Sequence, residues 1–585
     1  MKRAGFCEPA VETGSVTVDS SSDTLTPVGP MARVVAARPA APVRSEPRAS
    51  AAPWLDRATA GRWIALGLGV VAAVVTTWGI ATPWPWSDEG ATYLALQRSW
   101  GDLAVLWQGP DAPMVPYYYL AKAWTAALWS FWPALSTLVA VRLLSAAAGA
   151  ATVVVLYALV ARNAGRFAGV LAGLVLLSLP GFVRYAQEAR PYALLALAAT
   201  VSWLASDRRL RPGRVALGFR SLVPASGPTG GVGAATGHLL SLVAVGAIHT
   251  FGVFQWPAQL LAWLVAPGEL RWRLRRAASI VLTLVAAAVL AGGQLVMSAA
   301  HGTGAAGLAA HRLVTPATIT EQLLRAISLT YALPVSAIVL VLALVGLFSR
   351  PGGRRELPVG LLIWLAVPLA LALAVGTVRT NLFRLRYWVA FLPPLAALAA
   401  LGIVAVAGLF VRLVWRARAA DASSWSGGAR VAAGVTALAL LAVQVATVLP
   451  AQRFVRSANG HSENLSGVFA AISDARAEHP GIPVVITKGN ANGMIGAADP
   501  AVMANNPLSR IDPSTHIVYS TVPSAQAVRT SLAGDRYLLW IYKGTVTAAE
   551  AARGVPAALA DLHPTILHAA PAGTGWTAVL MELPG

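Results

Sequence analysis

Cysteine and charge are both scarce in this chain. Cys7 is the only cysteine among 585 residues, so no disulfide can form within the chain. Charged residues make up only 12% of the sequence, whereas hydrophobic residues make up 56%. Because the core of a soluble domain stops growing near roughly 250 to 300 residues, a soluble fold could not bury so much apolar surface. The composition therefore indicates a polytopic membrane protein.

Acidic residues are too few to balance the basic ones, which leaves a formal net charge of +20. Such an excess can indicate nucleic-acid binding, but here the basic residues are almost all arginines placed between long apolar runs. Arginine in that position marks the cytoplasmic ends of membrane spans. We therefore exclude nucleic acid as a partner and use the arginines to assign the topology.

Long apolar runs predict the membrane spans. One of them, residues 238–265, must fold back near His249 and Gly252 if the arginines at 271–276 are to face the cytoplasm. With that fold-back we expect about eleven transmembrane helices in an all-α polytopic membrane domain. The apolar runs cover residues 63–82, 138–160, 167–183, 191–205, 238–265, 278–298, 331–348, 357–376, 389–411 and 431–449.

The sequence divides into three parts. Residues 1–60 lack periodicity and predict a disordered cytoplasmic tail. Residues 61–450 form the membrane domain, whose first outer loop covers residues 83–137. Residues 451–585 carry nine basic and nine acidic residues and predict a small extracytoplasmic α/β domain. Its expected strands lie at residues 482–487, 516–521, 536–542 and 576–583.

The first outer loop begins with PWPWSDEG, which places Asp88 and Glu89 at the outer surface of the membrane. Carboxylates near lipid are costly and usually have a function. The alternative is that Ser87 or Asp88 only caps the following helix. Further along the loop, Asp111 offers another carboxylate that could position a metal, an acceptor hydroxyl or a donor, or it is a loop residue without such a role.

The sequence RYAQEARPYALL lies between the third and fourth apolar runs and gathers many polar groups at one helical turn. Arginines there could bind a phosphate, and the glutamate could hold an arginine in place or bind sugar hydroxyls. An ion pair between helices without any ligand is the alternative. The candidates are Arg184, Tyr185, Gln187, Glu188, Arg190 and Tyr192.

Two further outer segments carry candidate residues. His249 lies at the fold-back of the 238–265 run, where it meets the same site or serves as a structural hydrogen bonder. The segment TVRTNLFRLRYW departs from the charge rule because it places Arg379, Arg384 and Arg386 outside. A guanidinium cluster there suits a phosphate or pyrophosphate headgroup, with interfacial anchoring as the alternative.

Together these motifs resemble the GT-C superfamily of polyprenyl-phosphate-sugar-dependent glycosyltransferases, in the bacterial protein-mannosyltransferase-like or ArnT-like branch. SDEGATYLAL is similar to the acidic motif of the family, RYAQEARPYALL to its Gln-Glu-x-Arg-Pro-Tyr signature, and AIHTFGVF to its His-aromatic hairpin. LRYWVAFLPP and DAPMVPYYYL, with Tyr118, also resemble family segments, but Met114 stands where the family has His. The resemblance covers residues 60 to 450.

The resemblance implies inverting transfer of a hexosyl or pentosyl group from a polyprenyl-phosphate donor. Asp88 is expected to be the general base, and Glu89 to orient the acceptor or a divalent cation. The outer arginines would stabilise the departing phosphate, and the remaining candidates would bind substrate. Metal dependence, the sugar and the acceptor, whether envelope glycan, lipid or protein, stay open. A lipid-linked sugar transporter or flippase and a non-catalytic envelope assembly protein are the competing hypotheses.

Overall fold

The computed structural model describes most of the chain from residue 57 onward. The predicted cytoplasmic tail, including Cys7, lies almost wholly outside the described residues. The described residues are 57–210, 232–301, 315–329, 333–378, 385–414, 426–486, 489–504, 506, 530, 532, 534–544, 547–555, 557–573 and 575–584.

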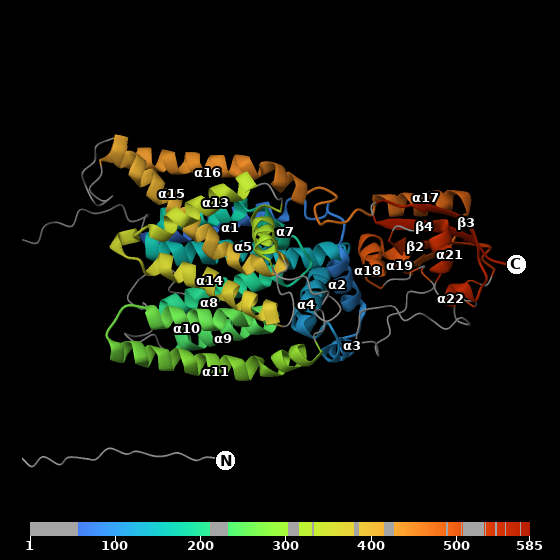
Figure 1. Cartoon of the computed structure of the whole chain (residues 1–585), viewed down its shortest axis with the longest axis horizontal. Coiled ribbons are helices and arrows are strands. Elements are labelled where there is room, and N and C mark those ends of the chain that lie inside the picture. The colour runs from blue at the N-terminus through green and yellow to red at the C-terminus, as the bar shows by residue number, and fades with distance from the viewer. Residues whose placement is uncertain are drawn as a thin grey trace, which may run out of the picture. The chain divides into compact units, whose positions relative to one another are not determined.

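The membrane domain is a bundle of helices (Figure 1). Between its first two long helices lies the first loop, with α2 (Ser87–Gln97), α3 (Asp102–Val105), η1 (Leu106–Gln108), η2 (Ala112–Met114) and α4 (Val115–Phe131). The bundle itself consists of α1 (Arg57–Thr77), α5 (Thr137–Ala164), α6 (Arg166–Ser178), α7 (Pro180–Ala186), α8 (Tyr192–Leu210), α9 (Val232–Ile248), η3 (Thr250–Phe254), α10 (Gln255–Val265), α11 (Leu270–His301), α12 (Pro316–Ser328), α13 (Leu333–Phe348), η5 (Pro351–Gly353), α14 (Glu356–Val378), η6 (Leu385–Phe391), α15 (Leu392–Val414) and α16 (Gly427–Val455).

Six of the described helices are each long and apolar enough to cross a membrane, namely α1, α5, α11, α14, α15 and α16. The pair α6 and α7, bent by 75° at Leu179, makes a seventh if it forms one span. Helices α9 and α13 are shorter apolar helices. Large apolar side chains on α11, such as Leu282 and Val289, are exposed, as expected of a helix that faces lipid. The protein is a polytopic, all-α membrane protein with a small C-terminal α/β domain.

The run at 238–265 folds back where the sequence predicts. Helix α9 ends at Ile248, and α10 returns antiparallel beside it, since His238 contacts Gln259 at 2.7 Å and Trp256 bonds the carbonyl of Leu242 at 3.3 Å. The turn between them carries His249.

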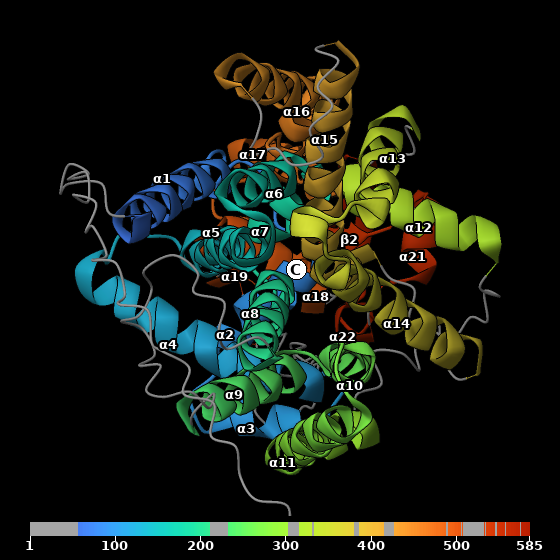
Figure 2. The ribbon, with the colours of Figure 1, turned by 90° about the vertical axis from the view of Figure 1, so that its left-hand side faces the viewer.

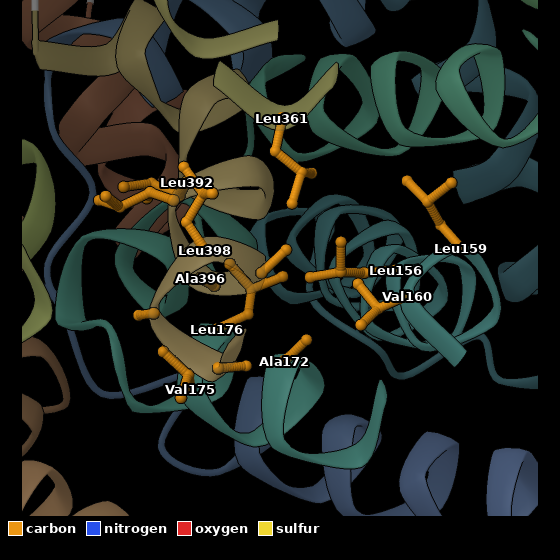
Figure 3. Close-up of a cluster of buried hydrophobic side chains, with 14 of the residues drawn as sticks. Leu156, Leu159, Val160, Ala172, Val175, Leu176, Leu361, Leu392, Ala396 and Leu398 are labelled. Carbon is orange, nitrogen blue, oxygen red and sulfur yellow. The ribbon is translucent and has the colours of Figure 1, made fainter. Parts of the chain in front are cut away.

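The bundle core lies between α1, α5, α6, α8, α13, α14 and α15. Leucines, valines and alanines of α5, α6, α14 and α15 meet there (Figure 3), and α5, α7 and α8 lie near the centre of the bundle (Figure 2). Helices α13 and α15 touch backbone to backbone, because a Cβ added to Gly346 or Gly402 would lie 1.8 Å from a carbonyl oxygen of the other helix. Small residues allow such close helix approach in membranes.

The C-terminal domain is a four-stranded sheet in the order β1-β2-β4-β3, with helices around it. Strand β1 pairs parallel to β2, and the other pairs are antiparallel. Three predicted strands are confirmed, the one at 516–521 lies outside the described residues, and β3 was not predicted. The elements are α17 (Ser466–Glu478), β1 (Val484–Ile486), α18 (Gly489–Ala498), α19 (Pro500–Ala504), β2 (Tyr537–Lys543), α21 (Ala548–Arg553), α22 (Ala557–Ala560), β3 (Thr565–Pro571) and β4 (Trp576–Glu582).

The first loop and the C-terminal domain lie at the same end of the bundle (Figure 1). Helix α18 packs against α2 so closely that a Cβ on Gly493 would lie 2.3 Å from the carbonyl oxygen of Gly90. At the other end, the last turns of α5, α8 and α10 and the first turns of α14 line a common cavity. Arg273 and Arg276 donate to the carbonyls of Leu264 and Pro267 at this end, and Arg162 pairs with Asp207.

Candidate active site

The start of α2 meets the turn between α7 and α8. Asp88 Oδ2 lies 2.9 Å from Arg386 Nη1 and 3.9 Å from Arg190 Nε. The hydroxyl of Tyr192 is 3.5 Å from the same oxygen. Side chains from the first loop, the α7–α8 turn and η6, which are far apart in the sequence, therefore share one site.

Asp88 and Glu89 both lie in the first turn of α2, where negative charge interacts favourably with the helix dipole. Successive residues of a helix point about 100° apart, so the two carboxylates face different surroundings. The side chain of Asp88 is 22% exposed, whereas that of Glu89 is fully buried. Only Asp88 of this pair is accessible to a substrate.

Glu89 is surrounded by donors. Arg142 of α5 binds it in bidentate fashion, with Nε and Nη2 each 2.8 Å from a carboxylate oxygen. The backbone N–H of Ala189 donates to Oε1 at 2.8 Å, and that of Trp86 donates to Oε2 at 3.4 Å. His461 Nδ1 lies 3.2 Å from Oε2. Glu89 thus ties α2 to α5, to the α7–α8 turn and to the segment after α16.

The protonation states of this cluster follow from its contacts. Burial alone would raise the pKa of Glu89, but the charge of Arg142 and its hydrogen bonds hold that pKa well below the ordinary value. Burial, with Arg184 and Arg142 nearby, lowers the pKa of His461 to about 3. Glu89 is therefore ionised and His461 neutral. Because a carboxylate only accepts hydrogen bonds, we assign the proton of the ring to Nδ1, which then donates to Glu89 Oε2.

Arg190 and Arg386 flank Asp88. Arg190 Nη1 lies 3.3 Å from the Asp88 carbonyl, the Thr92 hydroxyl and the Tyr118 hydroxyl. The Nε groups of both arginines are buried without a hydrogen-bond partner among the described residues. Arg386 is also 23% exposed. Both guanidinium groups thus keep donor capacity for an anionic ligand.

Arg184 and Glu188 form a buried ion pair one turn apart, at 2.8 Å. Arg184 Nη2 also donates to the carbonyl of His461 at 3.3 Å. Burial raises the pKa of Glu188 to about 7, with the charge of Arg184 opposing the rise. The pair joins residues four apart in the same segment, so it is not the ion pair between helices that the sequence left as the alternative.

Aromatic rings line the site beside Asp88. Tyr192 packs edge-on against Tyr185 with ring centroids 5.5 Å apart. His249 lies 6.0 Å from Tyr192 and 5.0 Å from Tyr387. His249 Nδ1 accepts the N–H of Phe251, and burial, with Arg190 and Arg386 nearby, lowers its pKa to about 3. His249 is therefore a neutral member of the wall.

The remaining predicted residues occupy distinct positions. Gln187 donates to the carbonyls of Thr76 and Trp78 and so joins the α7–α8 turn to the end of α1. Asp111 is partly buried, and burial raises its pKa, with Asp88 adding to the rise and Arg190 opposing it. The predicted phosphate ligands Arg379 and Arg384 lie outside the described residues.

Sequence reasoning missed Arg142 and His461. An arginine inside the apolar run 138–160 is itself a signal, because ionisable residues within spans are rare and need partners. His461 carried no such signal, since it follows the last span in a polar segment. Among the described residues, no group of three His, Cys, Asp or Glu side chains could hold a metal ion.

Comparison with solved structures shows which known fold this chain resembles. No protein-family model matches the chain, and no curated protein sequence matches it. Among solved structures, ArnT from Cupriavidus metallidurans bound to undecaprenyl phosphate matches with a TM-score of 0.52 at 14% identity, covering 89% of this chain and 98% of ArnT. The apo state of the same ArnT matches with a TM-score of 0.52 at 15% identity, over the same shares of both chains.

A lower TM-score of 0.45, at 14% identity, relates the chain to the oligosaccharyltransferase AglB from Archaeoglobus fulgidus, covering 83% of this chain and 70% of AglB. The chain has the GT-C fold, and the resemblance predicted from the motifs is confirmed at the level of the fold. ArnT is similar to this chain over most of the length of both chains.

Proposed function

We propose that this protein is a membrane glycosyltransferase that transfers a sugar, with inversion, from a polyprenyl-phosphate donor to an acceptor of the cell envelope. The observation that carries the proposal is the contact of Asp88 with Arg386 and Arg190 on a GT-C fold. ArnT of that fold binds undecaprenyl phosphate, a lipid phosphate of the kind such a donor would release.

Asp88 is the general base in this proposal. Its carboxylate is partly exposed and lies beside two guanidinium groups, so an acceptor hydroxyl could approach it while the donor phosphate is held next to it. A positioned carboxylate typically accelerates such a reaction by about 100- to 10,000-fold. The proton of the hydroxyl passes to Asp88 as the oxygen attacks the anomeric carbon.

Arg386 and Arg190 stabilise the phosphate that leaves. Charge develops on the phosphate oxygen as the glycosidic bond breaks, and guanidinium donors placed beforehand lower the barrier. Burial of both Nε groups without a partner among the described residues fits this use. Tyr192, Tyr185 and His249 form the adjoining wall, and Asp111 and Tyr118 lie around Arg190, where the sugar or acceptor would bind.

Glu89 does not contact substrate in this scheme. It holds Asp88 in position. All its surroundings are protein donors, which leaves no free carboxylate lone pair for an acceptor or a cation. By holding the first turn of α2 against α5 and the α7–α8 turn, it fixes the place of Asp88.

The proposed reaction takes place on the outer face of the membrane. Arg162, Arg273 and Arg276 lie at the helix ends opposite the C-terminal domain, and arginines that flank spans face the cytoplasm under the positive-inside rule. The site and residues 451–585 are then extracytoplasmic, and the N-terminus is cytoplasmic. Cysteine accessibility to an impermeant reagent at introduced positions in intact cells tests this orientation.

Substitution of Asp88 by Asn tests the function. In purified protein assayed with a range of polyprenyl-phosphate sugars, Asp88→Asn should reduce turnover by at least about 100-fold while the unfolding temperature stays near that of the wild type. Asp474→Asn, on the exposed face of α17, is the matched control and should transfer normally. Turnover by Asp88→Asn equal to wild type would overturn the proposal, and sugar translocation by both proteins would favour a transporter.

A further inference from the structure

The segment that joins the bundle to the C-terminal domain reaches into the candidate site. Residues 456–465, here called the connector, follow α16 and precede α17. The N–H of Trp84, in the first loop, donates to the carbonyl of Ala458 at 2.9 Å. The connector and the loop that carries Asp88 are therefore hydrogen-bonded to each other two residues before α2 is capped.

The connector is a tightly wound turn. The N–H groups of Ser457, Gly460 and Ser462 each bond a carbonyl three residues earlier. A Cβ added to Gly460 would lie 2.0 Å from the carbonyl oxygen of Val455, so only glycine fits there. Ser462 takes a left-handed φ of 69°, which is unusual for a residue with a side chain. These features place one side chain, that of His461, toward the bundle.

His461 is completely buried against the charged cluster. Its Nδ1 lies 3.2 Å from Glu89 Oε2 and 3.2 Å from Arg142 Nη2. Its backbone carbonyl accepts a hydrogen bond from Arg184 at 3.3 Å. The connector thus contacts both ion pairs of the site, Glu89 with Arg142 and Glu188 with Arg184, through a single residue.

The imidazole of His461 supplies the Glu89 carboxylate with a hydrogen-bond donor that no other described side chain provides at that place. Arg142 and two backbone N–H groups account for the remaining contacts of the Glu89 carboxylate. His461 Nε2 is buried without a hydrogen-bond partner among the described residues. A buried polar atom left unpaired is costly, which argues that the ring is kept there for its Nδ1 contact rather than for packing alone.

We propose that His461 is a positioning residue for sugar transfer, which donates a hydrogen bond to Glu89 and so couples the C-terminal domain to the placement of Asp88. The inference rests on the proposed function. Glu89 directly follows Asp88 in the first turn of α2, so a shift of Glu89 moves Asp88 relative to Arg386 and Arg190. A displacement of about 1 Å at a reacting group can cost about 100-fold in rate.

Three substitutions at His461 distinguish the effect of losing the hydrogen-bond donor from the effect of losing the volume of the ring. His461→Leu keeps an apolar side chain of useful size without the donor, and His461→Ala removes both. His461→Asn retains an amide N–H close to the Nδ1 position. We expect kcat to fall about 10- to 100-fold for the leucine and alanine variants with little change in KM for the donor lipid. The asparagine variant should recover most of the lost kcat, which a purely structural role of the ring would not produce.

His568→Ala is the matched control. His568 lies in β3 of the same domain and is exposed, so this variant should keep the wild-type kcat and KM. A kcat for His461→Leu within twofold of wild type, or equal losses in the leucine and asparagine variants, would overturn the inference while leaving the proposed function intact.

A double-mutant cycle on unfolding temperature gives a readout that does not depend on activity. If His461 acts through Glu89, the effects of His461→Leu and Glu89→Gln on unfolding temperature should be clearly less than additive. Additive effects would contradict the contact. A wild-type protein without any transfer activity, but with a non-additive cycle, would instead reject the proposed function and retain only the structural coupling.

Discussion

Asp88 Oδ2 accepts a hydrogen bond from Arg386 Nη1 at 2.9 Å, and both side chains are about one-fifth exposed. In the proposed mechanism these two groups have separate partners, the acceptor hydroxyl for Asp88 and the donor phosphate for Arg386. Without substrate, the Asp88 carboxylate and the Arg386 guanidinium are therefore each other's hydrogen-bond partners. A lipid phosphate that binds Arg386 competes with Asp88 for the guanidinium and leaves the carboxylate available as a base.

Loss of Arg386 should weaken both donor binding and catalysis. We expect Arg386→Ala to lower kcat/KM for the lipid-linked sugar by about 100- to 1,000-fold, since it removes a preorganised donor at the developing charge. Arg386→Lys keeps the charge but not the planar guanidinium, and should recover only part of the loss. Steady-state kinetics with the donor as the varied substrate measures both. Arg355→Ala, in the exposed join between α13 and α14, is the control, and an equal loss there would contradict a role specific to the site.

Asp88→Asn should have opposite effects on binding and on turnover. The substitution removes a negative charge next to the phosphate site and the competitor for Arg386, so affinity for polyprenyl phosphate without a sugar should equal or exceed that of wild type. Turnover should be lost in the same protein. Titration of the lipid phosphate into detergent-solubilised protein, followed by calorimetry or intrinsic fluorescence, tests this pair of effects. Weaker binding by Asp88→Asn would show that Asp88 supports the lipid phosphate rather than competing with it.

Glu89→Gln should destabilise the fold as well as reduce turnover. It leaves Arg142 fully buried without its counter-ion, and breaking a buried pair in this way costs about 3 to 5 kcal/mol. The free energy of unfolding in detergent should therefore fall strongly. Glu582→Gln breaks the more exposed pair with Arg536 and should change stability by less than about 1 kcal/mol. Equal effects of the two substitutions on the free energy of unfolding would contradict the conclusion that the buried Glu89–Arg142 pair stabilises the fold.

The membrane architecture and most of the site could be predicted because their signals are local. Apolar runs of about 20 residues locate spans, and arginines between them locate one end of the bundle. Asp88 and Arg190 stand in compact polar motifs, and the structure brings them to 3.9 Å. Tyr192 and His249 likewise come from such motifs and line the same wall.

The partners of those motifs were harder to predict because they depend on packing between distant segments. Arg142 is a single charged residue in an apolar helix, and the residues next to it in the sequence do not indicate that Glu89 is its partner. His461 reaches Glu89 only because the connector winds into a tight turn around Gly460. The division of roles between Asp88 and Glu89 also needed the structure, since helix geometry buries one carboxylate and leaves the other exposed.

Glu188 should give the protein a distinctive pH dependence. Burial raises its pKa from the ordinary 4.5 to about 7 in the folded protein, against the opposing charge of Arg184. Between about pH 4.5 and pH 7 the folded state therefore holds a proton that the unfolded state has released. The stability that this proton contributes is present below pH 4.5 and is lost as the pH rises through about 7.

Thermal unfolding of wild type and Glu188→Gln between pH 4.5 and pH 8 isolates this contribution. His249 and His461, whose pKa values are lowered to about 3, produce the opposite trend, with stability lost as the pH falls below their ordinary value of 6.5. Both proteins share that trend, so it cancels in the difference between them. The unfolding temperature of wild type should fall relative to Glu188→Gln as the pH rises, and the difference should level off above about pH 7. Parallel curves across the whole range would show that Glu188 is ionised in the folded protein and that its ion pair with Arg184 outweighs burial.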